Sequence, residues 1–368
     1  MLYFDHAATS YPKPECVKKA CMEAFENAGN PGRGSHSAAL WSLRTIYSAR
    51  EAAAKLFNAK SPMEIVFAQN ATMALNMAIS QADGEILTTA MEHNSVLRPC
   101  HARGNYRIVP AQNGILTPQA VIDAIGPDTK AVIMTHASNL TGEVYDIGTV
   151  GRYCREKGIL FITDAAQTAG VVPIDVQEMG IDMLAFAGHK GPMGPTGTGG
   201  LYVNSRVKVR PLMRGGTGSK SHQLVQPEEM PDVLEAGTQN VHGIAGLKAG
   251  IEYVMDIGVE RIFAHEKAMA KLFIDGISDI PGIEIYRREC VRTGTVAINI
   301  HDVDPADLTD ALGEAGVCVR GGAHCAPLAH DAIGTGDCGA VRFSFGWSTT
   351  AEEVLEGVKI LHALVKDI

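Results

Sequence analysis

The chain has 368 residues, of which 46% are hydrophobic and 20% charged, a balance typical of a folded globular protein and unlike that of a disordered chain. Its 41 acidic and 32 basic residues give a net charge of −9 with histidine neutral, and no Lys/Arg-rich tract is present, so a nucleic-acid ligand is not expected. Asp5 precedes any apolar leader, and no apolar run reaches the roughly 18 residues of a membrane-spanning helix, so we expect a cytoplasmic protein without membrane contact.

Short apolar runs alternate with longer amphipathic stretches along the first 240 residues, which is the pattern of parallel strands joined by crossover helices. An amphipathic helix is predicted over residues 37–57, and Thr117 is predicted to cap a second helix that ends at residue 125. The predicted strands, which we expect in one large sheet, are residues 64–67, 85–88, 131–135, 159–163, 183–186 and 200–203. Residues 1–240 are therefore assigned to a large α/β domain.

A different order of elements follows residue 240. Residues 214–240 are rich in Gly, Ser, Gln and Pro without a clear period, which predicts a functional loop. Helices are then predicted at 244–254, 259–277, 305–315 and 351–365, and strands at 283–286, 295–300 and 341–345. We assign residues 241–368 to a smaller α+β domain, against which the N-terminal segment is expected to pack.

Two predicted strands are followed by polar residues suited to ligand binding. Thr72 lies at the start of a predicted helix, whose free N–H groups can hold a phosphate, although Asn70 or Thr72 in this position can also serve only as a helix cap. Asp164 ends an apolar strand at the edge where open α/β sheets bind ligands. It is placed to meet a cation, and the alternative is again a cap of the next helix.

Lys190 stands among glycines and other small residues directly after the predicted strand 183–186. Small neighbours allow a bulky ligand to reach the amine, and a desolvated lysine becomes a nucleophile. The order GxxxxGK[ST] is missing, which excludes a P-loop. A Gly-rich turn without function remains the alternative.

Cys325 follows two glycines and His324, near Arg320 and Arg342, a basic setting that favours a thiolate. Cys318, between two valines, is instead predicted to be a buried small side chain. The eight cysteines are about 2% of a long chain in which no secretion signal is expected, so reduced thiols are expected, and the lack of a CxxC pair gives no zinc-ribbon or thioredoxin-type motif. A zinc site is the remaining alternative, and its possible ligands are His324, Cys325, His330 and Cys338. Their spacing matches no standard zinc pattern, so no metal is expected.

Asp164, Gln167 and the His189-Lys190 pair together resemble the class V aminotransferase branch of the fold-type I pyridoxal-phosphate (PLP) enzymes. Further motifs are similar to cysteine desulfurases and selenocysteine lyases: Tyr3-Phe-Asp-His-Ala-Ala8, Arg33-Gly-Ser-His36, Met91-Glu-His93-Asn, Glu235-Ala-Gly-Thr238 and the run from Arg320 to Cys325. The resemblance covers nearly the whole chain and implies the PLP-transferase fold type I. The short run before Cys325 resembles the group with a compact cysteine loop.

The resemblance also implies roles for individual positions. The implied catalytic residues are Lys190, which would hold PLP covalently and move a proton, Cys325, which would take the sulfur, and His93, which would stack on the ring. The implied cofactor contacts are Thr72, His93, Asp164, Gln167, His189, Lys190 and, from the neighbouring subunit, Thr238. The implied substrate contacts are Arg342, Asn139, His36 and Arg320.

The implied activity is the conversion of L-cysteine to L-alanine by a PLP-dependent homodimer, with a persulfide on Cys325 that is passed to an acceptor protein. The alternatives are a selenocysteine lyase, another class V aminotransferase or lyase in which Cys325 is incidental, and a non-enzymatic metal-binding or scaffold protein. Two positions depart from the family pattern. Ala187 replaces a serine that donates to the phosphate, and Ala323 replaces a second histidine of the cysteine loop.

Overall fold

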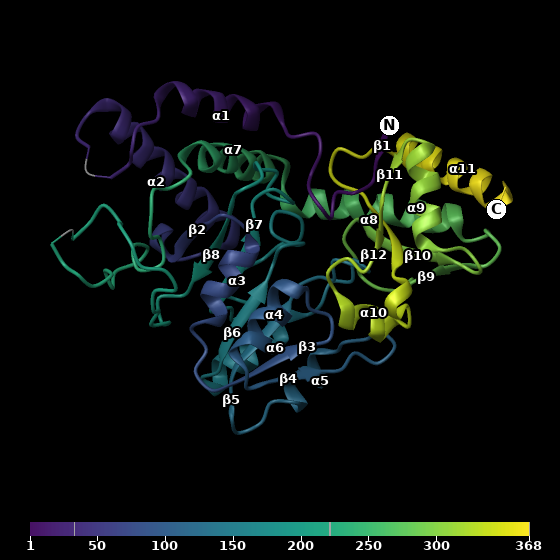
Figure 1. The fold of residues 1–368 in the computed structure, drawn as a ribbon, viewed down its shortest axis with the longest axis horizontal. Coiled ribbons are helices and arrows are strands. Elements are labelled where there is room, and N and C mark those ends of the chain that lie inside the picture. The colour runs from purple at the N-terminus through teal and green to yellow at the C-terminus, as the bar shows by residue number, and fades with distance from the viewer. Residues whose placement is uncertain (33, 221, 368) are drawn as a thin grey trace.

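The central element is a seven-stranded sheet within residues 1–32, 34–220 and 222–367, which are the residues that this computed structural model describes (Figure 1). In spatial order its strands are β2 (Ile65–Ala68), β8 (Gly199–Val203), β7 (Met183–Ala187), β6 (Leu160–Asp164), β5 (Thr129–Thr135), β3 (Glu85–Thr89) and β4 (Tyr106–Val109). β8 runs antiparallel to both neighbours, and the other pairs are parallel. The six strands predicted from the first 240 residues are all present, and β4 is an additional edge strand.

Helices cover both faces of this sheet because successive strand residues point to opposite sides. In β5, Val132 and Met134 belong to one core cluster, whereas Ala131 and Ile133 belong to the other. The first cluster includes side chains of α2 (Ser37–Phe57), α5 (Pro118–Asp123), α6 (Ile147–Lys157) and α7 (Val241–Ile257). The second includes side chains of α3 (Ala71–Ile79) and α4 (Asn94–Arg103).

The helix predicted at 244–254 is α7, which begins three residues earlier because Asn240 caps it by accepting from the Gly243 N–H at 3.0 Å. It packs against α2 and against α1 (Glu15–Asn27), as Figure 1 shows above the sheet. The Thr117 cap is confirmed by a 3.2 Å bond from the Ala120 N–H. The domain boundary at residue 240 stays a prediction, since α7 joins the core of the large sheet.

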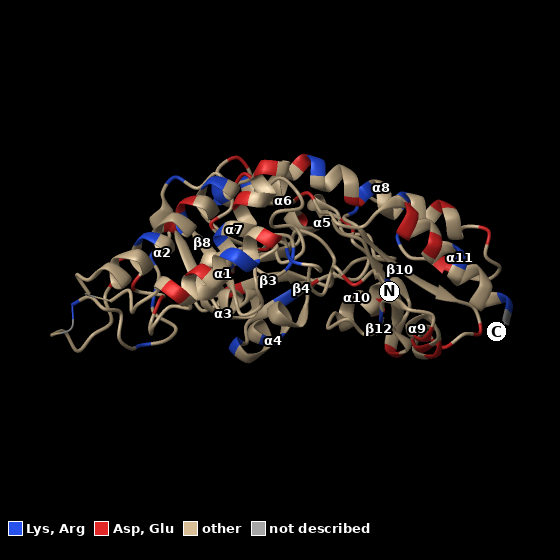
Figure 2. Ribbon diagram, turned by 90° about the horizontal axis from the view of Figure 1, so that it is seen from above, with Lys and Arg blue, Asp and Glu red and all other residues tan. Residues whose placement is uncertain are grey.

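A second sheet lies in the C-terminal part of the described chain and has four antiparallel strands. In spatial order these are β12 (Arg320–Gly322), β13 (Ala340–Ser344), β10 (Thr295–Ile300) and β9 (Ile283–Ile285). Side chains of α8 (Val259–Ile277), α9 (Pro305–Glu314) and α11 (Ala351–Asp367) complete its core. Figure 2 shows basic and acidic residues interspersed along α8 and α11 and acidic residues on α9.

The N-terminal segment joins this C-terminal unit, as expected. β1 (Leu2–Tyr3) pairs in parallel with β11 (Val317–Cys318). Phe4 is fully buried, and its ring centroid lies 5.0 Å from that of Phe345. The first residues of the chain are therefore held beside residues that are more than 300 positions away in the sequence.

The remaining segments are short helices and loops. η1 (Pro62–Glu64) precedes β2, whereas α10 (Pro327–Ile333) and η2 (Gly336–Cys338) follow the Cys325 loop. The described residues of the predicted loop 214–240 contain no helix or strand, and this segment projects from the body of the molecule in Figure 1. Among the residues that can be described, no helix is long and apolar enough to cross a bilayer.

Candidate active site

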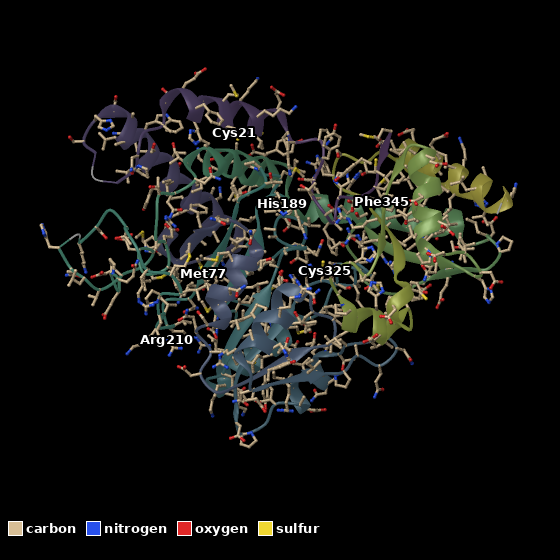
Figure 3. The ribbon with its side chains drawn as sticks, viewed as in Figure 1. Cys21, Met77, His189, Arg210, Cys325 and Phe345 are labelled. Atoms are coloured by element: carbon tan, nitrogen blue, oxygen red, sulfur yellow. The ribbon has the colours of Figure 1, made fainter. Side chains whose placement is uncertain are left out.

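A cavity of about 620 Å³ opens between the carboxyl ends of the large-sheet strands and the C-terminal sheet. Ten of the twelve predicted site residues line it: Thr72, His93, Asn139, Asp164, Gln167, His189, Lys190, Arg320, Cys325 and Arg342. Figure 3 labels two of them, His189 near the large sheet and Cys325 beside the C-terminal unit. Ala187 also lines the cavity.

Asp164 is the last residue of β6, and its carboxylate is buried at the end of the strand. Oδ1 accepts a 2.8 Å hydrogen bond from the Ala166 N–H, which fixes the carboxylate. Burial raises the pKa of Asp164, whereas this hydrogen bond and the positive charge of Lys190 lower it. A buried carboxylate of this kind is stabilised further when a cationic partner enters the cavity.

Lys190 follows β7 in a tight turn of small residues and is half-buried at the cavity wall. Burial lowers the pKa of Lys190 to about 8; Arg342 acts in the same direction, and Asp164 acts in the opposite one. At pH 7 roughly a tenth of this amine is therefore unprotonated, far more than for an ordinary lysine, and the unprotonated form is the one that a nucleophile or a base requires.

Hydroxyl groups gather where α3 and α4 begin. Asn70 caps α3 by accepting from the Met73 N–H at 2.9 Å, so Thr72 is not needed as the cap. The Thr72 hydroxyl instead lies 2.7 Å from the Ser95 hydroxyl. With the free N–H groups of the first helical turn, these two hydroxyls form a site suited to a phosphate.

His93 caps α4, since its Nδ1 accepts from the Ser95 N–H at 3.0 Å. Burial lowers the pKa of His93 to about 4, and the neighbouring charge of Lys190 acts in the same direction. The ring is therefore neutral at physiological pH, and its Nε2 carries the hydrogen. A neutral ring that lines the cavity is suited to stacking on an aromatic ligand.

The N-terminal segment closes the cavity near His189. The His189 carbonyl accepts hydrogen bonds from the Thr9 hydroxyl at 3.0 Å, the Ser10 N–H at 3.1 Å and the Lys13 ammonium at 2.7 Å. Gln167 Nε2 donates to the Ala7 carbonyl at 3.2 Å. Burial lowers the pKa of His189 to about 4, so this ring is neutral as well.

Two arginines share one carboxylate on the opposite wall. Arg342 in β13 and Arg320 in β12 each lie 2.9 Å from an oxygen of Asp5. Arg342 also donates to the Asn139 carbonyl at 2.9 Å, while its buried Nε has no hydrogen-bond partner among the described residues. Two guanidinium groups on a single carboxylate leave a net positive charge, which is suited to the carboxylate of a substrate.

Cys325 is exposed at the rim of the cavity, in a turn where both His324 and Cys325 have positive φ angles of 49° and 56°. The Asn94 N–H donates to the Cys325 carbonyl at 2.7 Å, and Asn139 Nδ2 donates to the His324 carbonyl at 2.7 Å. Left-handed conformations are unfavourable for side chains other than glycine by about 1–2 kcal/mol each, so external contacts must hold this turn.

The structure corrects two details of the sequence analysis around this loop. Burial lowers the pKa of His324 to about 3, so His324 is neutral and the positive charge near Cys325 comes from Arg320 and Arg342. Cys318, which was expected to be buried, is only partly so. Within the described ranges, no group of three or more His, Cys, Asp or Glu side chains is arranged to hold a metal ion.

Two predicted residues lie outside this cavity in the single chain. His36 is exposed and caps α2 by accepting from the Ala39 N–H at 3.4 Å. Thr238 is exposed in a separate hollow, next to Glu235, whose carboxylate pairs with Arg50 and accepts from the Phe67 N–H at 2.6 Å. Arg33, which belongs to the quoted motif, lies outside the described residues.

No role was expected from the sequence for Asp5, Thr9, Ser95 or the buried Glu92. Asp5 and Glu92 lie inside the motifs 3–8 and 91–94 that were quoted for the resemblance, so those motifs were the available signal. Glu92 Oε1 accepts from the Thr89 hydroxyl at 2.6 Å and from the Thr135 N–H at 3.0 Å, and so joins the ends of β3 and β5. Burial raises the pKa of Glu92 to about 8.

Comparison with known proteins agrees with this geometry. The model of the family Aminotransferase class-V matches residues 2–356. A probable cysteine desulfurase from Methanothermobacter thermautotrophicus is 37% identical over 369 residues, which are 96% of this chain and 92% of that protein. The cysteine desulfurase IscS from Pseudoalteromonas translucida is 32% identical over 390 residues, 98% of this chain and 91% of that protein. The apo structure of a cysteine desulfurase from Thermococcus onnurineus aligns with a TM-score of 0.91 at 30% identity and covers 100% of this chain and 95% of that chain.

The chain therefore belongs to the class-V aminotransferase family, which is a family of PLP enzymes. Within the family it groups with relatives that carry the name cysteine desulfurase. The family resemblance and the expected fold type I are both confirmed.

Proposed function

We propose that the chain is a PLP-dependent cysteine desulfurase that converts L-cysteine to L-alanine and carries the sulfur on Cys325. The observation that carries the proposal is a single cavity with Lys190 and Asp164 on one wall and Cys325 and Arg342 on the other. A cavity with only the first pair would suit many PLP enzymes. The exposed thiol opposite the lysine is what favours sulfur transfer.

The residues present fit PLP by their chemistry. Lys190 is an amine with a lowered pKa, Asp164 is a buried carboxylate beside it, and His93 is a neutral ring. We expect these three to hold the aldehyde carbon, the ring nitrogen and the ring face of PLP. Thr72 would bind the phosphate, and the adjacent Ser95 hydroxyl is a candidate to replace the donor lost at Ala187.

When bound, PLP would supply an electron sink that acidifies the Cα–H of an amino acid. Arg342 would bind the substrate carboxylate, and the Lys190 amine would move the proton to and from Cα. The Cys325 thiolate attacks the sulfur of the substrate: the C–S bond breaks, an S–S bond forms, and the carbon that loses sulfur gains the proton that the thiol has lost. One cysteine and one thiol thus give one alanine and one persulfide.

The test is alanine formation by the purified holoenzyme with Cys325→Ala beside Cys338→Ala, an exposed cysteine that does not line the cavity. Cys325→Ala should abolish alanine formation from L-cysteine, while Cys338→Ala should keep it. Mass spectrometry after brief exposure to L-cysteine should show one added sulfur on the Cys325 peptide. A persulfide on another cysteine, or full activity of Cys325→Ala, would leave only a general PLP lyase.

L-selenocysteine separates the proposed activity from that of a selenocysteine lyase. A selenolate leaves more readily than a thiolate, so Cys325→Ala should keep much of its activity on L-selenocysteine. The exposure of Cys325 supports transfer of the sulfur to an acceptor protein. A wild-type enzyme that forms alanine from L-selenocysteine only would contradict the desulfurase and favour the lyase.

We also infer a homodimer in which Thr238 reaches the site of the neighbouring subunit. Support comes from large apolar side chains exposed on α1, on α2 and in the adjoining loop: Met22, Phe25, Leu40, Leu43, Tyr47, Leu212, Met213, Leu224 and Val225. Burial of such side chains between two copies would remove them from water.

Complementation of two impaired variants tests this dimer. Thr238→Ala should weaken PLP binding, and Lys190→Ala should be inactive. In a mixed dimer the Lys190 of the first chain faces the intact Thr238 of the second, so one site of two recovers. If mixing restores nothing although light scattering shows mixed dimers, Thr238 acts within its own chain or not at all.

A further inference from the structure

His330 lies fully buried in α10, behind the Cys325 loop, and the proposed reaction does not use it. It does not line the cavity, whereas its neighbour His324 does. His330 Nε2 lies 3.3 Å from His324 Nδ1, and His330 Nδ1 lies 2.6 Å from the hydroxyl of Thr335. A chain of polar groups thus runs from the interior of the C-terminal unit to the residue before Cys325.

The two rings meet edge to edge. Their centroids are 5.5 Å apart, and the ring planes are inclined by only 13°. Because the facing nitrogens of His324 and His330 are separated by 3.3 Å, this centroid distance requires that the nitrogens lie between the ring centres. The arrangement is that of a hydrogen bond between imidazoles and differs from face-to-face stacking.

The partners determine which nitrogen carries each hydrogen. His324 Nε2 lies 3.0 Å from the Arg320 carbonyl, which can only accept, so this nitrogen carries the hydrogen. His324 is neutral because burial lowers its pKa to about 3, and its Nδ1 is therefore an acceptor. The hydrogen between the rings consequently belongs to His330 Nε2.

Thr335 holds the other side of the His330 ring. Burial lowers the pKa of His330, although Asp331 and the Ala323 carbonyl act in the opposite direction. The Thr335 hydroxyl lies 2.6 Å from Nδ1 and donates to the His330 carbonyl at 3.2 Å. A hydroxyl both donates and accepts, so Thr335 anchors the ring with Nε2 toward His324 without fixing its tautomer.

We propose that His330, set by Thr335, is a positioning residue for Cys325: it holds the ring of His324 and thereby the left-handed turn that places the thiol at the cavity. Both ring nitrogens of His324 are committed, so His324 is not the group that exchanges a proton with the thiol. The inference rests on the proposed function, in which Cys325 receives the sulfur.

Four variants of the holoenzyme test the proposal. His330→Leu removes the donor, His330→Gln can restore a donor to His324, and Thr335→Val removes the hydroxyl that anchors the Nδ1 side of the His330 ring. His362→Leu is the matched control, since His362 Nε2 donates to the Gly276 carbonyl at 2.9 Å in the same unit and does not contact this chain of groups. The measurements are the rate of Cys325 alkylation by iodoacetamide and alanine formation from L-cysteine and from L-selenocysteine.

A displaced thiol should slow the step that needs it, and a misplacement of this kind costs about 10- to 100-fold. His330→Leu should therefore lower alanine formation from L-cysteine by about that factor, with KM little changed, and alter the alkylation rate. Activity on L-selenocysteine, which does not need the attack of Cys325, should change far less. His330→Gln should recover most of the loss, Thr335→Val should lie between, and His362→Leu should match the wild type.

Equal losses on both substrates would show a merely structural role and overturn the proposal, as would unchanged alkylation and activity in His330→Leu. If His330→Leu does not fold, Thr335→Val decides, because a Thr335→Val protein with wild-type alkylation and cysteine turnover would contradict the anchoring of His330 by Thr335 on which the proposal depends. The proposed function would fail separately, if the wild-type enzyme formed no persulfide on Cys325, whatever the alkylation rates of the variants.

Discussion

The two walls of the cavity are built differently. On the large-sheet wall, the chemistry comes from groups at strand ends and helix starts, and burial shifts their pKa values: up at Asp164, down to about 8 at Lys190 and down to about 4 at His93. On the C-terminal wall, Cys325 is exposed and its turn is held by hydrogen bonds from Asn94 and Asn139. The large-sheet wall thus carries groups whose pKa values are shifted by burial, whereas the C-terminal wall fixes the position of a thiol.

The largest effect is expected at Lys190, on the large-sheet wall. Lys190→Ala should form no alanine from either substrate and should lose PLP on dialysis, because no amine remains to hold the aldehyde. Borohydride reduction of the wild-type holoenzyme should fix PLP on the Lys190 peptide and leave none fixed in the variant. Attachment at another lysine would contradict the assignment of Lys190 as the residue that holds PLP.

A loss of several orders of magnitude is expected for Asp164→Asn on both substrates. A neutral amide can still accept from the Ala166 N–H, so the fold should survive, but it cannot stabilise a protonated ring nitrogen. The matched control is Asp175→Asn, since Asp175 accepts from the Gln177 N–H in the same i to i+2 pattern away from the cavity. Turnover of both variants and their circular dichroism give the answer, and near-normal turnover of Asp164→Asn would remove this carboxylate from the mechanism.

Below the pKa of Lys190, the rate of PLP capture should rise by about tenfold per pH unit. Only the unprotonated amine of Lys190 attacks the aldehyde, and the pKa of Lys190 is lowered to about 8. The rate of covalent attachment of added PLP to the apoenzyme should rise from pH 6 to pH 8 and level off above it. A rate that continues to rise toward pH 10 would show that burial does not tune this lysine.

The smallest effect is expected at Glu92. Burial raises its folded-state pKa from 4.5 to about 8, so the free energy of unfolding should fall as pH rises between these values, because the unfolded chain loses the proton first. Glu92→Gln cannot ionise, and its stability relative to the wild type should increase across that window. Urea unfolding at pH 5 and at pH 8.5 measures the difference.

A positive control for that measurement is Glu266, which lies in α8 of the C-terminal unit. Burial also raises the pKa of Glu266 to about 8, so Glu266→Gln should show the same sign of change in stability. The stability difference between wild type and Glu92→Gln could instead be equal at both pH values. Glu92 would then already be ionised and paired in the folded protein, and burial would not raise its pKa.

Much of the fold was predictable because its strands are buried on both faces. Residues 131–134 of β5 and all of β7 are continuous apolar runs, and such runs are recognisable without any partner. β4 was missed because an edge strand keeps polar residues, and Arg107 faces solvent in an ion pair with Glu85. β12, residues Arg320–Gly322, consists of an arginine and two glycines, and only its pairing with β13 makes it a strand.

The site was predictable where chemistry and local sequence coincide, as at Lys190 among glycines and Asp164 at a strand end. Groups defined by distant contacts were not predictable. Asp5 holds two arginines more than 300 residues away, and the neutral state of His324 depends on burial against α10. Thr238 lies outside the cavity of the single chain, and the role expected for it depends on a second copy of the chain.

The segment from β1 to Lys13 has a consequence for the order in which the protein is made. Asp5 contacts Arg342, and the two are 337 positions apart. A chain that emerges from the ribosome N-terminus first must therefore keep its first residues unpaired until almost all of its length has been translated. The large sheet can assemble earlier from sequential strands, but the wall that carries Arg342 forms only at the end of synthesis. A nascent chain stalled before β13 should accordingly have a sheet and no finished pocket, so the pocket is complete only at the end of synthesis.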